Sequence, residues 1–185
     1  MGVNKTKVMT TISALALAAV ALTGCTPSPD TVATVGDDYV LTQGGLDGVV
    51  DSCRSVVESS GQKFSDRFAT DAMAYLVLGQ VYSKIASANG VQITNEDRDN
   101  TLKVLDPEGS LTQLRANPGC APVVDSVLNM TFANQMVGES ILMKELSSIK
   151  VQINPAYGKW SSVYGLMPGE SGSLSSFDSR FDFKG

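Results

Sequence analysis

The chain has 185 residues, a net formal charge of −5 at neutral pH, 43% hydrophobic residues and no histidine. The absence of histidine excludes the usual general base at neutral pH, the commonest metal ligand, and every Ser-His or Cys-His nucleophile pair. The excess of acidic residues argues against binding to nucleic acid and against electrostatic docking on anionic lipid.

The N-terminal sequence predicts an export signal that ends in a lipid-attachment site. Lys5 and Lys7 precede an uncharged, mostly apolar run over residues 8–22. This run is shorter than the roughly 18–20 apolar residues of a membrane-spanning helix, and it is typical of a signal-peptide core. The Leu-Thr-Gly-Cys sequence at 22–25 resembles the lipobox of bacterial lipoproteins, which implies lipidation of Cys25 and cleavage just before it. The alternative is an ordinary secretory signal with an incidental cysteine.

We therefore expect a lipoprotein signal peptide over residues 1–24 and a lipid-bearing tether over residues 25–30. Cleavage would change the net formal charge from −5 to −7, because two lysines and no acidic residue would leave. Acyl chains on Cys25 would hold the protein on the extracytoplasmic face of the cell membrane, and two chains are needed for stable anchoring. The rest of the chain is long enough for one domain with a hydrophobic core.

A hairpin and a helix are predicted after the tether. Two β-prone stretches flank a Gly-Asp-Asp sequence at 36–38 and predict a hairpin over residues 32–41. Thr42 is the predicted N-cap of a helix of about 17 residues. Apolar residues at helical spacing define its buried face: Leu46, Val49, Val50, Cys53, Val56 and Val57.

Three further segments continue the helical pattern. A second helix is predicted from near Ser65 to the Asn-Gly stop at 89–90. A third begins at Thr94, which with Asp97 resembles a capping box in which the shorter acid is substituted, and it ends at an Asp-Pro sequence. A short fourth helix is predicted over residues 111–115.

The longest predicted helix covers about residues 123–148, with Pro122 in its first turn. Residues 149–153 then alternate in strand fashion, and we expect them to pair with the N-terminal hairpin. The aromatic stretch over residues 157–160 is expected to pack back on the domain. Glycine and serine enrichment predicts an irregular tail over residues 161–185.

The cysteines predict one disulfide. Once Cys25 carries lipid, Cys53 and Cys120 remain as an even pair, which in an exported protein is most simply a disulfide. Such a bridge would join the first helix to the start of the longest one. The alternative is two separately buried thiols.

Three short sequences occur in an order that matches a known family. Val-Gly-Asp-Asp-Tyr-Val-Leu-Thr occupies 35–42, Val-Gln-Ile-Thr-Asn-Glu-Asp occupies 91–97, and Asn-Pro-Ala-Tyr-Gly-Lys-Trp occupies 154–160. Together they resemble the N-terminal domain of SurA-type periplasmic and extracytoplasmic foldases, in a form similar to actinobacterial lipoproteins. The resemblance implies a mainly α, α+β domain over residues 31–160, with about four to five helices. Its small sheet would combine the N-terminal hairpin with the C-terminal strand.

The resemblance implies a chaperone-like module without the family's catalysis. Complete foldases of this group carry a parvulin prolyl-isomerase domain whose active site uses paired histidines, and this chain has neither. We therefore expect a non-catalytic holdase that binds unfolded or extended segments of exported polypeptides. The competing hypothesis is a structural or adaptor lipoprotein that binds one folded partner in the envelope. Neither hypothesis includes an enzymatic activity, a cofactor or a metal site.

Three further patterns each allow two interpretations. Residues 95–106 alternate oxygen-bearing side chains like a calcium loop, but they lack its central glycine and closing glutamate, so an exposed helix face is favoured. The Asn-Met-Thr sequence at 129–131 matches a glycosylation acceptor inside a predicted helix, where chance is favoured. Met130, Met136 and Met143 form either core packing, which is favoured, or a flexible binding face.

Overall fold

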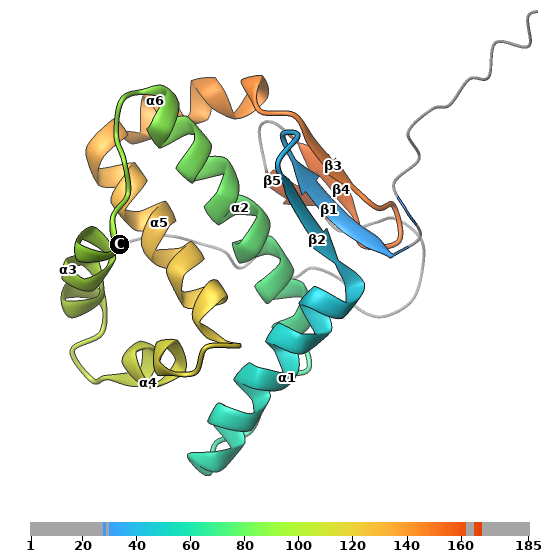
Figure 1. The fold of residues 1–185 in the computed structure, drawn as a ribbon, viewed down its shortest axis with the longest axis vertical. Coiled ribbons are helices and arrows are strands. Elements are labelled where there is room, and N and C mark those ends of the chain that lie inside the picture. Colours follow the sequence, from blue (N-terminus) through green and yellow to red (C-terminus); the bar gives the residue numbers. More distant parts are fainter. Residues whose placement is uncertain (1–27, 29, 162–164, 168–185) are drawn as a thin grey trace, which may run out of the picture.

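The computed structural model describes residues 28, 30–161 and 165–167. Six α-helices accompany a three-stranded antiparallel sheet and a separate two-stranded hairpin in this part of the chain. The longest helix, α2 (Phe68–Ala88), lies between the sheet and α5 (Ala121–Val137) (Figure 1). The predicted α+β class, mainly helical with a small sheet, is confirmed.

The two ends of the domain share one sheet. Its strands are β1 (Thr31–Val35), β2 (Tyr39–Thr42) and β3 (Val151–Ile153), in the order β2-β1-β3 with both pairs antiparallel. The β1–β2 turn begins at Gly36, whose φ of 63° favours glycine and whose N–H donates to the Lys150 carbonyl at 2.8 Å. The predicted hairpin and its pairing with the returning strand are therefore confirmed.

Side-chain caps fix the starts of two helices. Thr42 precedes α1 (Gln43–Ser59) and accepts a hydrogen bond from the Gly45 N–H. Thr94 precedes α3 (Asn95–Leu105), and it exchanges hydrogen bonds with Asp97 in a complete capping box. Both predicted caps are confirmed, as is the short fourth helix, α4 (Ser110–Ala116).

The predicted helix over residues 123–148 is wrong in its length. Pro122 does lie in the first turn of α5, but that helix ends at Val137. Gly138 follows with a φ of 87°, which a continuing right-handed helix cannot contain. The chain resumes as α6 (Glu139–Glu145) and ends in a 3₁₀ turn (Leu146–Ser148).

The main helix pair, α2 and α5, is in backbone contact at one point. A Cβ atom at Gly79 of α2 would lie 2.5 Å from the Ser126 Cβ and 2.7 Å from the Ser126 Cα. Glycine is therefore required for this approach of the two helices. The side chains buried most completely around this pair include Met73, Ile85 and Leu128.

Regular structure extends past the predicted domain boundary at residue 160. Strand β4 (Lys159–Ser161) pairs with β5 (Gly165–Met167), and Trp160 and Leu166 pack against the core. The irregular tail predicted over residues 161–185 therefore contains strand residues at its start, because two apolar side chains find a place on the core. Residues 168–185 lie outside the described residues.

Candidate functional site

The structure tests only part of the predicted site. Residues 1–24 and Cys25 lie outside the described residues, so lipidation stays a prediction. Cys53 of α1 and Cys120, at the start of α5, form a disulfide between Cα atoms 4.8 Å apart, and both side chains are buried. The predicted pairing is confirmed, and it favours an oxidising compartment. No helix in the described part of the chain is long and apolar enough to cross a bilayer.

A broad depression on the described surface lies between α3, α4 and α5. This α3–α5 groove is broad and open, with a volume of about 980 Å³. Its apolar lining comes from all three helices and from the α3–α4 turn: Leu102, Pro107, Ala116 and Ala121. Charged residues share the lining: Asp99, Lys103, Asp106, Arg115 and Asp125. The volume lies at the upper end of the range for small-molecule sites, and the open shape suits a chain that passes through.

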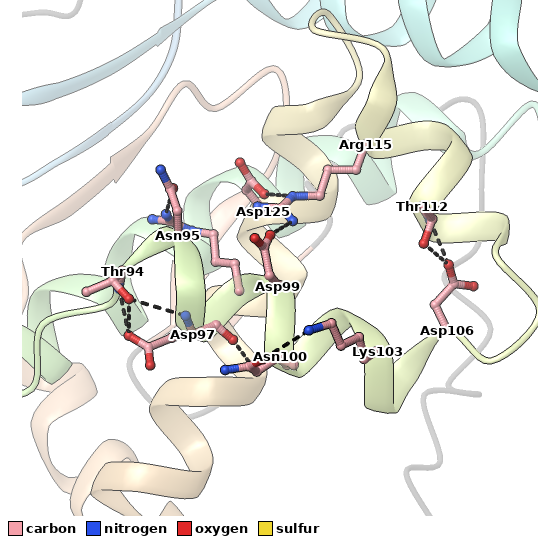
Figure 2. A network of polar contacts seen from close by, with 12 residues as sticks. Thr94, Asn95, Asp97, Asp99, Asn100, Lys103, Asp106, Thr112, Arg115 and Asp125 are labelled. Carbon is pink, nitrogen blue, oxygen red and sulfur yellow. Dashed lines mark hydrogen bonds and ion pairs between the residues drawn. The ribbon is translucent and has the colours of Figure 1, made fainter.

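One arginine connects the three helices that form the groove. Arg115 of α4 donates from Nε to Asp125 of α5 at 2.6 Å and from Nη1 to Asp99 of α3 at 2.5 Å (Figure 2). Burial alone would lower the pKa of Arg115, but the hydrogen bonds and charges of the two carboxylates raise it above its usual value. The guanidinium therefore stays charged and orders the groove.

Two other carboxylates accept hydrogen bonds from threonines at the starts of helices: Asp97, outside the groove lining, and Asp106, within it. Asp97 accepts from the Thr94 hydroxyl and N–H, and these hydrogen bonds lower the pKa of Asp97. Asp106 accepts from the Thr112 N–H at 2.7 Å and from its hydroxyl at 2.8 Å (Figure 2). Burial alone would raise the pKa of Asp106, but the bonds from α4 hold it below its usual value. A carboxyl group with a lowered pKa is a weak general base.

The calcium-like and glycosylation-like sequences are parts of helices. Residues 95–105 form α3, so their oxygen atoms do not surround a loop. The Asn129 side chain is buried, and its Oδ1 accepts from Arg98 Nε at 2.7 Å. No group of three or more His, Cys, Asp and Glu side chains in the described residues could hold a metal ion. Both sequences therefore have structural explanations.

Several large apolar side chains are exposed near the Gly138 break. Met136 is 58% exposed, Met143 45% and Ile141 39%, whereas Met73 fills the core. The favoured prediction of core packing is therefore wrong for Met136 and Met143. Ile141 and Met143 are two residues apart on α6, so they point to nearly opposite sides of that helix. These side chains do not define one binding face, and the α3–α5 groove is the better candidate.

Comparisons of the chain with models of protein families, with curated proteins and with solved structures return no match. The candidate site therefore depends on its geometry and chemistry. The sequence-based prediction missed the groove and the role of Arg115. Its partners lie 16 and 10 residues away along the chain on two other helices, and no local pattern indicates that they converge.

Proposed function

We propose that this protein is a membrane-anchored extracytoplasmic lipoprotein that acts as a non-catalytic holdase for exported polypeptides. The observation that carries the proposal is the α3–α5 groove, which is open, partly apolar and built on three helices. A client, meaning an unfolded or extended polypeptide segment, would bury apolar side chains against Leu102, Ala116 and Ala121. Its backbone would find hydrogen-bond partners in the polar lining, as in other modes of peptide recognition.

The chemistry of the groove favours holding over catalysis. Arg115 is engaged by two carboxylates, and the Asp106 carboxylate accepts hydrogen bonds from the Thr112 N–H and hydroxyl. The chain has no histidine to act as a general base at neutral pH. Prolyl isomerisation must overcome a barrier of about 18–20 kcal/mol, and we expect no acceleration of it.

The cysteines support an extracytoplasmic location in two ways. Lipidation of Cys25 would place the domain at the membrane, and the disulfide favours the oxidising side of it. The resemblance to SurA-type N-terminal domains points to the same compartment and the same class of client. The lipid supplies location, whereas the groove supplies binding.

A blocking substitution in the groove tests the proposal. Ala116 is exposed, is the last residue of α4 and lines the groove, so Ala116→Trp fills space there without entering the core. Ala88 is exposed and is the last residue of α2, outside the groove lining, so Ala88→Trp is a matched control. The processed protein in mild detergent should slow aggregation of an unfolded client at near-stoichiometric ratios. Ala116→Trp should lose most of this effect, and Ala88→Trp should keep it.

Two results would overturn the proposal. A native protein that leaves client aggregation unchanged, yet copurifies with one folded envelope protein, would favour the adaptor hypothesis. Equal protection by the native protein and by Ala116→Trp would place binding outside the groove.

A further inference from the structure

The lining of the α3–α5 groove has more negative than positive side chains, and the two kinds differ in how fully they are hydrogen-bonded. It contains three carboxylates, those of Asp99, Asp106 and Asp125, against the two cations of Lys103 and Arg115. The groove therefore carries one negative charge in excess. The carboxylates keep oxygen atoms that can still accept hydrogen bonds, whereas the Arg115 guanidinium already donates to two carboxylates. This difference determines which kind of client the groove can bind.

The Arg115 guanidinium is already engaged by carboxylates, and among the described residues Lys103 donates only to a neutral amide. Arg115 donates to both Asp99 and Asp125, and Lys103 Nζ donates to Asn100 Oδ1 at 3.4 Å (Figure 2). An anionic client would have to compete with two carboxylates for the Arg115 guanidinium. The groove is therefore poorly suited to acidic segments.

The carboxylates keep unused capacity. Asp99 and Asp125 each bond Arg115 through Oδ1, and the second oxygen of each has no hydrogen-bond partner among the described residues. Their side chains are 58% and 35% exposed, so both carboxylates are at least partly accessible. A carboxylate offers about four lone-pair sites, and a single donor leaves most of them free. Lysine and arginine side chains supply the strongest donors for such sites.

We infer that the α3–α5 groove selects extended polypeptide segments that combine apolar side chains with a lysine or arginine. The apolar residues would lie against Leu102 and Ala121, and the cation would reach the outer oxygens of Asp99 and Asp125. This inference rests on the proposed function and adds to it the class of client. The excess negative charge of the lining and the apolar surface beside it are both required.

Three labelled peptides test the inference directly. They share one short apolar sequence and differ at two central positions, which are both Lys, both Gln or both Glu. Fluorescence anisotropy with the processed protein in mild detergent measures each affinity, and the Ala116→Trp variant gives the background from micelles. One charge-assisted hydrogen bond corresponds to about a tenfold change in affinity, so the Lys peptide should bind about tenfold tighter than the Gln peptide. The Glu peptide should bind more weakly still, and added salt should reduce the difference.

Charge-removing variants locate the selectivity. Asp99→Asn and Asp125→Asn should each reduce the preference for the Lys peptide several-fold, measured for each variant as the ratio of its affinities for the Lys and Gln peptides. Asp51→Asn changes the net charge equally on the exposed face of α1, outside the groove, and should leave the preference unchanged. Thermal melts of each variant separate lost selectivity from lost folding.

The results distinguish failure of the inference from failure of the proposed function. If all three peptides bind the native protein equally and bind Ala116→Trp less well, the groove holds clients without charge selection and the inference is overturned. If no peptide binds the native protein better than Ala116→Trp, the proposed function fails together with the inference. Equal loss of preference in Asp51→Asn would assign the effect to net charge and would also overturn it.

Discussion

A close approach between α2 and α5 gives a quantitative prediction for Gly79→Ala. The new Cβ would lie 2.5 Å from the Ser126 Cβ and 2.7 Å from its Cα. Carbon atoms in favourable contact are about 3.5–4.0 Å apart, so the helices must separate by about 1 Å. Neither clashing atom is the end of a flexible side chain, so the strain falls on the backbone of α5.

The expected cost follows from two opposing effects. Overpacking of a well-packed core costs about 1–3 kcal/mol, and the rigid partner here places the value at the upper end. Replacing glycine by alanine inside a helix contributes about 1 kcal/mol in the opposite direction. We therefore expect Gly79→Ala to lower the free energy of unfolding by about 2 kcal/mol.

Gly48→Ala is the matched control. Gly48 also lies inside a helix, α1, but a Cβ there would meet no atom within 4 Å. This variant should gain about 1 kcal/mol from helix propensity alone. Urea denaturation of both variants measures the difference, which should be about 3 kcal/mol. Equal stability of the two variants would refute the close approach of α2 and α5.

Three further predictions concern the disulfide, a helix cap and the anchor. Replacing Cys53 and Cys120 together by serine removes a link between residues 67 positions apart. In the chain-entropy model this should lower the free energy of unfolding, measured in urea, by about 4 kcal/mol. Unchanged stability would contradict this prediction. Hydrogen bonds from Thr94 lower the pKa of Asp97 below its usual 3.8. The Asp97 carboxylate therefore stabilises the fold above pH 3.8, and this contribution is lost as the pH falls through the lowered pKa. The melting temperature of Asp97→Asn should therefore lie below that of the native protein at pH 7 and approach it near pH 2; a gap independent of pH would exclude this role. Cys25→Ala should move the protein from the membrane fraction to the soluble fraction, and an unmodified Cys25 in mass spectrometry of the native N-terminus would contradict the anchor.

Local signals predicted much of this fold because each one acts over a few residues. Thr42 and Thr94 cap helices through contacts only three residues away. The Asn-Gly sequence at 89–90 ends α2 because Gly90 adopts a φ of 78°. The Cys53–Cys120 pair was predictable by counting, since it leaves no cysteine over once Cys25 is assigned to lipid.

The errors arose where a break had no local signal or where tertiary contacts overrode the local pattern. Apolar periodicity continues on both sides of Gly138, and a single glycine within such a pattern is usually tolerated, so the break between α5 and α6 had no distinctive signal. The β4–β5 hairpin lies in a sequence rich in glycine and serine, and it is ordered by the packing of Trp160 and Leu166 on the core. Composition alone could not indicate that packing.

Sequence analysis could not predict the α3–α5 groove, because it also depends on tertiary packing. Asp99, Arg115 and Asp125 come from three different helices, and their convergence depends on how those helices pack. The Asp-rich sequence of α3 was correctly interpreted as a helix face, but its role in a shared network was not predicted.

Site-specific photo-crosslinking to an unfolded client tests the central claim most directly. Lys103→benzoylphenylalanine places the crosslinker in the α3–α5 groove on an exposed residue. Lys144→benzoylphenylalanine places it on the exposed surface of α6, beside Met143, the competing apolar location. A client held in the groove should be captured strongly from position 103, should lose this capture in Ala116→Trp, and should be captured little from position 144. Equal capture from both positions, or capture from position 144 alone, would contradict it.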